Sequence, residues 1–435
     1  MKYAFALCLA SAPLAAQVPD PGTPPPPLTL RALFDSVAAT HPLVRAAQSR
    51  TRAAQGSRIT AGALGNPVLS YQVDRMPLAS GQPSSGDDRE IMTTVTFPLE
   101  AFYQRWPRVQ AADAIVRAAQ ADADLARQRI ALEAADSYYR TAFAQVGVST
   151  ARDLLAWLDT LVAYNRARVE EGAAAEADLV RAELERDRAA ADATMQEVEL
   201  ARARATLAAF LGEPRRSALA TVMMSNRPLA LAGDAGAAFI TPPALDRRPD
   251  VRAARSRADA SRAGVTTERA LIVRQFGATI GAKRMAGNTS LVAGLSIPLP
   301  LVDVNRGQIR RASAERDAAL FDLAAAERAA SADLAGAQDV ARLLTARTEL
   351  LTAGRNGGFL ARAEEARRIA LGAYREGAVP LLTVLDAARA WGDARATFYR
   401  TLYAQHQSVL VLLAAQGIDL FTHVPATAEP VAPNR

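Results

Sequence analysis

The chain has 435 residues, of which 98 are alanine, 22% are charged and 6% are aromatic. Alanine and straight-chain charged residues favour helices because they lose little side-chain entropy there, so this composition argues against an all-β sandwich and against a disordered chain. The net charge of +6 does not predict a nucleic-acid partner, because the arginines alternate with acidic residues, as at 181–188, in the manner of a solvated helix face.

Residues 1–16 have the pattern of a secretory signal peptide. Lys2 precedes a short apolar stretch, and small residues follow up to Ala16. Cys8 is the single cysteine of the chain. It follows Leu7 rather than a small residue, which argues against a lipid-anchored cysteine, and cleavage near Ala16 would remove it. The mature chain is therefore expected to contain no disulfide and no cysteine metal site, and to begin with a proline-rich segment over residues 17–28.

The rest of the chain is predicted to be a tandem repeat. Segments 41–50 and 248–257 agree at most positions, and the Glu-Gly-Ala sequence at 171–173 recurs at 376–378 with nearly the same spacing. Such ordered similarity indicates duplicated structural units. The expected divisions are repeat 1 over 29–212, a linker over 213–247, repeat 2 over 248–420, and a C-terminal tail over 421–435.

Each repeat is predicted to run helix, strand, strand, helix, helix. In repeat 1 the first helix is expected from about Thr29 to Gly62, and the β-hairpins are expected at about 66–98 and 274–299. In the first strand, Leu69, Tyr71 and Val73 alternate with polar residues, which indicates a half-buried strand. The strands approach the ~9–11 residues of a transmembrane β-strand. Two hairpins cannot close a barrel, and open edges are not tolerated in lipid. Membrane-spanning strands would therefore need several chains in one barrel, whereas a soluble hairpin on a helical domain is the alternative.

The predicted helices are long. Residues 305–352 contain no proline and would extend over roughly 70 Å at ~1.5 Å per residue. Small and apolar residues recur there with a period near 3.5, which is typical of packed helices. Segments 108–146, 176–211 and 381–416 have similar patterns. In the helix predicted over 305–352, the expected seam positions form two rows. They are Ile309, Arg316, Leu323, Ala330, Ala337, Leu344 and Leu351, and Ala312, Ala319, Ala326, Asp333, Val340 and Arg347.

Nothing in the sequence predicts an enzyme or a cofactor. The chain contains no nucleophile-elbow or phosphate-cradling motif. Its three histidines, at 41, 406 and 423, are too scattered to suggest a metal centre. We therefore expect no catalytic residue, no cofactor-binding residue and no resident metal.

Three segments give the chain a specific resemblance. They are Arg-Pro-Asp-Val-Arg-Ala-Ala at 248–254, Leu-Ser-Ile-Pro-Leu-Pro-Leu at 295–301 with Asn-Arg-Gly following at 305–307, and Tyr-Arg-Glu-Gly with Leu-Leu-Thr-Val-Leu-Asp-Ala in 374–387. In order and spacing the chain resembles the TolC-like outer membrane efflux family, most of all its heavy-metal (CzcC-like) branch.

The resemblance implies a fold, partners and a function. The fold is mainly α with a small β part: a long α-helical coiled-coil barrel, with four transmembrane strands from each protomer of a homotrimer forming a 12-stranded β-barrel. The location is the outer membrane, with the helices in the periplasm. The expected function is a passive exit duct of a tripartite efflux system, connected by a periplasmic adaptor (membrane fusion) protein to an inner-membrane RND pump. Heavy-metal cations are the expected cargo.

Two alternatives remain open at this point. A duct of the same architecture could export drugs or other small molecules, since the sequence offers little direct evidence of metal ligands. A periplasmic coiled-coil scaffold without a barrel is the second alternative, and the strand alternation speaks against it.

The resemblance also implies site residues at two hairpin tips, residues 168–178 and 374–386. Gly172 and Gly377, with Glu171 and Glu376, are expected to contact the adaptor.

Related ducts have acidic residues near the aperture, and residue matching assigns this role to Asp386 and to Asp178, which is equivalent to Thr383 of repeat 2. Tyr374 matches a gating tyrosine of the family. Val379 stands where the family has a basic partner, so this chain departs from the usual gate network.

Overall fold

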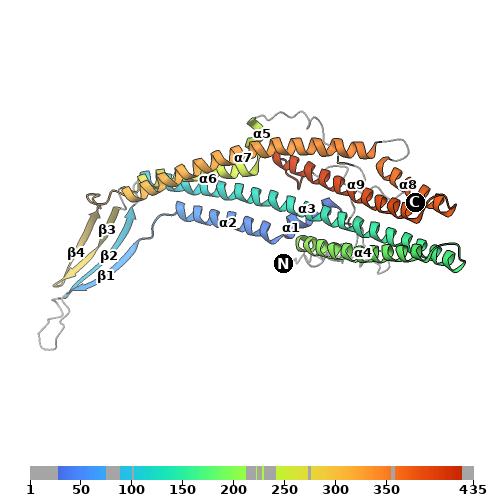
Figure 1. The fold of residues 1–435 in the computed structure, drawn as a ribbon. Coiled ribbons are helices and arrows are strands. Elements are labelled where there is room, and N and C mark those ends of the chain that lie inside the picture. The colour runs from blue at the N-terminus through green and yellow to red at the C-terminus, as the bar shows by residue number, and fades with distance from the viewer. Residues whose placement is uncertain are drawn as a thin grey trace, which may run out of the picture.

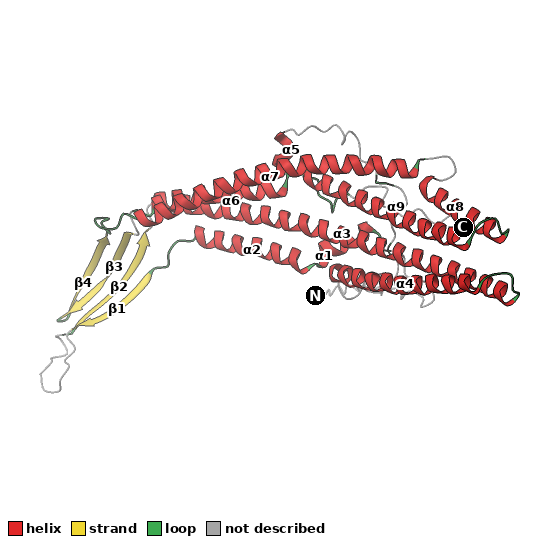
Figure 2. Ribbon diagram, in the orientation of Figure 1, coloured by secondary structure: helices red, strands yellow, loops and turns green. Residues whose placement is uncertain are grey.

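The computed structural model describes residues 28–74, 89–99, 102–211, 222, 228–229, 242–272, 276–353 and 358–423. The molecule is elongated, with a small sheet at one end and long helices extending from it (Figure 1, Figure 2). The predicted fold class, mainly helical with a small β part, is confirmed. The expected signal peptide, nearly all of the proline-rich segment, and most of the linker and tail lie outside the described residues.

The helices of the first half run alongside one another. They are α1 (Leu30–Thr40), α2 (Pro42–Gly62), α3 (Phe102–Glu170) and α4 (Glu176–Leu211). The 69 residues of α3 correspond to a length of about 100 Å. Helices α2 and α4 both contact α3 and lie end to end along it (Figure 1).

The second half repeats this arrangement with one difference. Its helices are α5 (Pro242–Arg247), α6 (Pro249–Ala270), α7 (Arg306–Thr352), α8 (Gly358–Arg375) and α9 (Leu381–Ala415). Helices α6 and α9 both contact α7, as α2 and α4 contact α3. The partner of α3 is thus divided into α7 and α8, whereas α3 itself is continuous.

The helix predicted from Thr29 to Gly62 is interrupted, so that prediction is wrong. His41 is extended, with φ −64° and ψ 126°, and Pro42 begins α2. A residue before proline disfavours the helical region, because the proline ring clashes with its backbone. Arg248 has nearly the same angles before Pro249, so both halves have a helix boundary at the same place.

The two hairpins join into one antiparallel sheet. Its strands are β1 (Val68–Asp74), β2 (Glu90–Leu99), β3 (Phe276–Met285) and β4 (Asn288–Ser296), in the order β1-β2-β3-β4. The halves meet through β2 and β3, where Val95 lies opposite Ile280. Within the described residues, β1 and β4 each have a neighbouring strand on one side alone.

The register separates an apolar face from a polar face. Leu69 lies opposite Val95, and Ile280 opposite Ala293, so apolar residues of all four strands share one face. Its outer positions are open to solvent, with Leu291 78% exposed. On the other face the hydroxyls of Thr96 and Thr279 are hydrogen-bonded at 3.0 Å. Lys283 forms an ion pair with Glu90 on that same face.

The seam predicted in α7 is half right. The buried residues include Ala312, Ala330, Ala337 and Leu351, as expected. The second row is displaced by one residue, because Leu334, Ala341 and Thr348 are buried. Asp333, Val340 and Arg347 therefore do not form the seam. Alanine is spread around most of this helix, so the sequence pattern could not separate neighbouring positions.

The largest apolar core lies midway along the molecule, where α1, α3 and α9 meet. It includes Phe34, Tyr138 and Leu410, and the Tyr138 hydroxyl donates a hydrogen bond of 3.0 Å to the carbonyl of Leu28. Over the described part of the chain, every helix is either too short or too polar to cross a membrane.

Candidate functional site

The two predicted hairpin tips have the same backbone structure. Gly172 and Gly377 have φ of +71° and +76°, a region that glycine adopts without steric cost. The amide of Ala173 donates to the carbonyl of Arg168 at 2.7 Å, and Ala378 donates to Ala373 at 2.8 Å. These six-residue hydrogen bonds define a Schellman motif, which ends α3 and α8 and turns the chain back into α4 and α9.

The tips lie together at the end of the molecule opposite the sheet (Figure 1). Gly172 and Gly377, with the neighbouring Glu171 and Glu376, are all exposed. The structure thus brings the four residues assigned to adaptor contact to one accessible end. Whether they contact an adaptor stays a prediction.

A buried hydrogen bond links the two hairpins just behind the tips. The hydroxyl of Tyr374 in α8 donates to Oδ1 of Asn165 in α3 at 2.5 Å. Asn165 is fully buried, and its Nδ2 donates to the carbonyl of Leu161 at 2.9 Å. The sequence analysis missed Asn165, because a single asparagine in a helix gives no indication of a partner more than 200 residues away.

Charged groups surround this hydrogen bond without replacing it. The guanidinium of Arg168 lies 5.7 Å from the ring of Tyr164 and 5.6 Å from that of Tyr374, within the range of a cation–π interaction. Burial raises the pKa of the Tyr374 hydroxyl, Arg168 opposes that effect, and Asp178 adds to it. The hydroxyl therefore stays protonated and able to donate.

Val379 fills the position where the resemblance suggested a basic residue. It packs against an apolar cluster that includes Leu158, Leu381 and Val384 beside Tyr374. A neutral asparagine thus accepts the tyrosine hydrogen bond, and an aliphatic side chain stands where the family's cation would be. The hydrogen bond between the hairpins at this level therefore joins two neutral side chains, and Arg168 adds a cation–π contact to Tyr374.

Asp386 lies in an ion-pair network rather than alone. Nη1 of Arg389 lies 3.3 Å from Oδ1 of Asp386, and Arg389 also pairs with Glu185 of α4. The side chain of Asp386 is 61% exposed. Asp178 acts electrostatically on Tyr374, whereas Asp386 pairs with Arg389, and no hydrogen bond or ion pair among the described residues joins the two aspartates.

A stack of tryptophan and arginine side chains joins three helices further from the tips. The guanidinium of Arg367 lies 4.0 Å from the ring of Trp391 and 5.7 Å from that of Trp157. The guanidinium of Arg395 lies 5.0 Å from the ring of Trp391, and Arg395 forms an ion pair of 2.9 Å with Asp153. This stack holds α8 and α9 against α3, and the sequence analysis did not find it.

Arg248 connects the start of α6 and the end of α9 to the middle of α7. Its Nη1 donates to the carbonyls of Ala330 and Ala415, and its Nη2 lies 2.7 Å from Asp250 and 3.3 Å from Asp333. Burial raises the pKa of Asp250, but the hydrogen bond and charge of Arg248 outweigh burial and lower it overall. Asp250 is therefore ionised at neutral pH.

Among the described residues, no group of three or more His, Cys, Asp or Glu side chains is placed to hold a metal ion. These residues instead allow recognition by shape and charge. The features concerned are the exposed tips, the hydrogen bond between Tyr374 and Asn165, and the polar face of the sheet.

Comparison with known proteins agrees with this architecture. The chain is 25% identical over 388 residues, 89% of each chain, to the cobalt-zinc-cadmium resistance protein CzcC of Cupriavidus metallidurans. Among solved structures it is similar to the outer membrane protein VceC of Vibrio cholerae, at a TM-score of 0.72 and 21% identity over 89% of this chain and 96% of that one. It is also similar to CusC, at a TM-score of 0.73 and 18% identity over 90% and 92%.

The family model for outer membrane efflux proteins matches residues 33–213 and 241–417, most of the chain. The chain therefore belongs to the outer membrane efflux protein family, whose members are outer membrane channel proteins rather than enzymes.

Proposed function

We propose that three copies of this chain form the passive exit duct of a tripartite efflux system. The sheet carries this proposal. It has one apolar and one polar face, and among the strands that the structure describes, β1 and β4 each have one unpaired edge. An open sheet edge is not stable in lipid. If β4 of one copy pairs with β1 of the next, three four-stranded sheets close into a 12-stranded barrel with its polar face toward water.

The outer helices support the same assembly. Val180, Leu184 and Met195 on α4 are more than half exposed, as are Leu343 and Leu350 on α7. Exposed apolar rows of this kind are typical of subunit interfaces. Acidic residues outnumber basic ones in α4, and the reverse holds in α8. These opposite charges favour contact between α4 of one copy and α8 of the next.

The tips complete the proposed duct. In a trimer the two hairpins of each copy surround the periplasmic entrance, and Tyr374 with Asn165 holds each pair of hairpins together. Asp386 and Asp178 each occur three times about the axis, which favours cations near the aperture. The exposed tips around Gly172 and Gly377 contact the adaptor, which connects the duct to an inner-membrane RND pump.

Divalent metal cations are the proposed cargo. The support is the relative whose name describes cobalt, zinc and cadmium resistance, together with the aspartates near the tips. Small organic molecules are the second candidate, and the cavity described below favours them. A scaffold without a barrel is the least supported alternative, because it gives no role to the apolar face of the sheet.

Cysteine crosslinking tests the assembly. Residues 28–423 contain no cysteine, so no native thiol in this range competes with an introduced pair. Ser70→Cys in β1 combined with single cysteines along β4 should give covalent dimers and trimers in outer membrane fractions. Met92→Cys with Lys283→Cys, which lie opposite each other within one chain, is the control and should crosslink only within a chain. Absence of intermolecular products for every β4 position would refute the shared barrel.

Planar-bilayer conductance tests the aperture and the cargo. Asp386→Ala should weaken the block of conductance by multivalent cations, and Asp393→Ala on the same helix is the control. Unchanged block would remove the aperture assignment. In a host lacking its own duct, restoration of zinc, cobalt and cadmium efflux with the cognate adaptor and pump would support metal cargo, whereas restoration of dye efflux alone would contradict it.

A further inference from the structure

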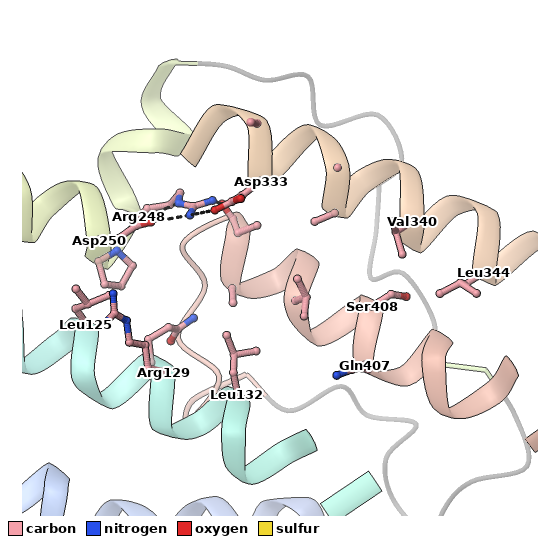
Figure 3. A pocket seen from close by; sticks show the side chains of 18 of the residues that line it. Leu125, Arg129, Leu132, Arg248, Asp250, Asp333, Val340, Leu344, Gln407 and Ser408 are labelled. Atoms are coloured by element: carbon pink, nitrogen blue, oxygen red, sulfur yellow. Dashed lines mark hydrogen bonds and ion pairs between the residues drawn. The ribbon is translucent and has the colours of Figure 1, made fainter. Parts of the chain in front are cut away.

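A cavity of about 880 Å³ lies among α3, α7, α9 and the start of α6 (Figure 3). It opens on one side of α9, where Gln407 and Val411 line it. The neighbouring Val409 belongs to the mid-molecule core on another side of that helix. The cavity therefore borders this core, because Leu132 and Ala414 line it and also pack against the core, and it is separate from the hairpin tips.

The walls of the cavity are mainly aliphatic. Leu125 and Leu132 of α3 face Val340 and Leu344 of α7 across it (Figure 3). Sites for small organic molecules usually have volumes of roughly 300–1,000 Å³ and apolar walls with a few polar groups. Both the size and the lining of this cavity fit that class.

Gly336 keeps the cavity open. It lies in the interior of α7, where glycine costs about 1 kcal/mol relative to alanine. A Cβ atom added there would meet nothing within 4 Å, so helix packing does not require glycine at this position. A larger side chain would extend into the cavity that Gly336 lines.

The charges around the cavity favour an anion at its rim. Arg248 engages both Asp250 and Asp333, so those carboxylates already have a cationic partner. Arg129 also lines the cavity, is exposed, and has no ion pair with any acidic residue that the structure describes. Its guanidinium can bind a carboxylate or sulfonate without competing with an existing partner.

We propose that this cavity binds an apolar small molecule that carries one negative charge, with its apolar part between α3 and α7 and its anionic group at Arg129. The residues that form the cavity all belong to one chain, so binding requires no second copy. The proposal therefore stands independently of the proposed function.

Equilibrium dialysis of the full chain in nanodiscs tests the proposal, with 2-naphthoate as the probe and empty nanodiscs as background. We expect saturable binding of one molecule per chain. Gly336→Phe should lower the association constant at least about tenfold by occupying the site. Gly264→Phe is the matched control, because a Cβ there also meets nothing within 4 Å, and binding should be unchanged.

The anionic group is tested separately. Arg129→Gln should weaken 2-naphthoate binding about two- to fivefold and leave the neutral 2-naphthamide unaffected. Arg117→Gln, an exposed arginine on the same helix, is the control. If Gly336→Phe fails to fold, Gly336→Leu replaces it.

Unsaturable binding of 2-naphthoate, or an unchanged association constant in Gly336→Phe, would overturn the proposal that the cavity is a binding site. Equal loss of the charged and neutral probes in Arg129→Gln would overturn the anionic assignment. Crosslinking between β1 and β4 is unaffected by either result, so failure of the cavity proposal is distinguishable from failure of the duct proposal.

Discussion

An end-to-end contact between two helices occurs once in each half of the chain, with different chemistry. In the first half, α4 ends beside the start of α2, and the ring of His41 stacks on Phe210 with centroids 5.6 Å apart. In the second half, α9 ends beside the start of α6, and Arg248 makes hydrogen bonds and ion pairs to α6, α7 and α9.

The difference shows that proline determines the backbone conformation at each junction, whereas the side chain before it determines the contacts between helices. Both junctions have a proline as the first residue of the following helix, and both preceding residues are extended, so the backbone is the same. Histidine contributes a local aromatic contact, whereas arginine connects three helices. We infer that the second junction is the more rigid. Measurements at both junctions test this inference, and two measurements at other contacts provide a scale for the effects.

The largest effect is expected at Arg248. Replacement by alanine removes a hydrogen-bond donor to Asp250 and to the carbonyls of Ala330 and Ala415. Arg248 is buried but Asp250 is 32% exposed, so the loss should be smaller than the about 3–5 kcal/mol typical of a fully buried pair. Arg248→Ala should therefore lower the Tm of the detergent-solubilised protein by several degrees. His41→Ala is the matched variant, and an equal loss at His41 would contradict the comparison.

The next effect concerns the hydrogen bond between the two hairpins. Tyr374→Phe removes the hydroxyl but keeps the ring, and leaves Asn165 with one unsatisfied buried oxygen, which costs about 1–3 kcal/mol. We expect more frequent open-state conductance in planar bilayers. Tyr399→Phe on α9 is the control. Unchanged gating in Tyr374→Phe would show that the hairpins are held together by the ion pairs of Arg389 and Arg395 instead.

A smaller effect is expected from pH at the first junction. Burial lowers the pKa of His41 below its usual 6.5, and Glu133 partly opposes this shift. The unfolded chain then binds the proton more readily than the folded one, so stability is complete above about pH 6.5 and decreases as the pH falls through that value toward the folded-state pKa. Arg248 stays charged throughout this range.

Hydrogen exchange measures that difference. Amides at the start of α2 should exchange faster at pH 5.5 than at pH 7.5 after correction for intrinsic rates, and amides at the start of α6 should not change. His41→Gln should remove the pH dependence. A parallel response of both helices would indicate a global effect rather than one at His41.

The smallest effect is expected for an ion pair confined to one helix. Arg202 and Glu199 of α4 lie 2.6 Å apart, with side chains 70% and 55% exposed. Such pairs contribute at most about 0.5 kcal/mol, so Arg202→Ala should leave the Tm almost unchanged. A loss comparable to that of Arg248→Ala would mean that connection of several helices is not what makes Arg248 important.

The sequence predicts the periodic parts of this structure well. Alternation identified the strands, and the register of β2 with β3 unites the apolar positions of both halves. The repeated Glu-Gly-Ala segments marked both tips, because glycine with positive φ is required there. These features depend on residues close in sequence, so a local pattern is sufficient to find them.

Contacts between distant residues were not predictable in the same way. Asn165, Trp157 and Arg367 have no local signature, and each acquires its role from a helix elsewhere in the chain. The break at Pro42 could have been found, since a proline at the first helical position is a known start signal. The one-residue error at Asp333 and Val340 has another cause, because alanine around most of α7 weakens the contrast that defines a seam.

The open edges of β1 and β4 also have a genetic consequence. If three chains close one barrel, each contributes a contiguous third of the wall, and a chain whose edge strand cannot pair leaves a gap that the other two cannot fill. A defective allele expressed beside a normal one would then behave as dominant. The number of working channels would fall more steeply than the fraction of intact chains, because a single defective chain is enough to inactivate a complex that contains two intact ones.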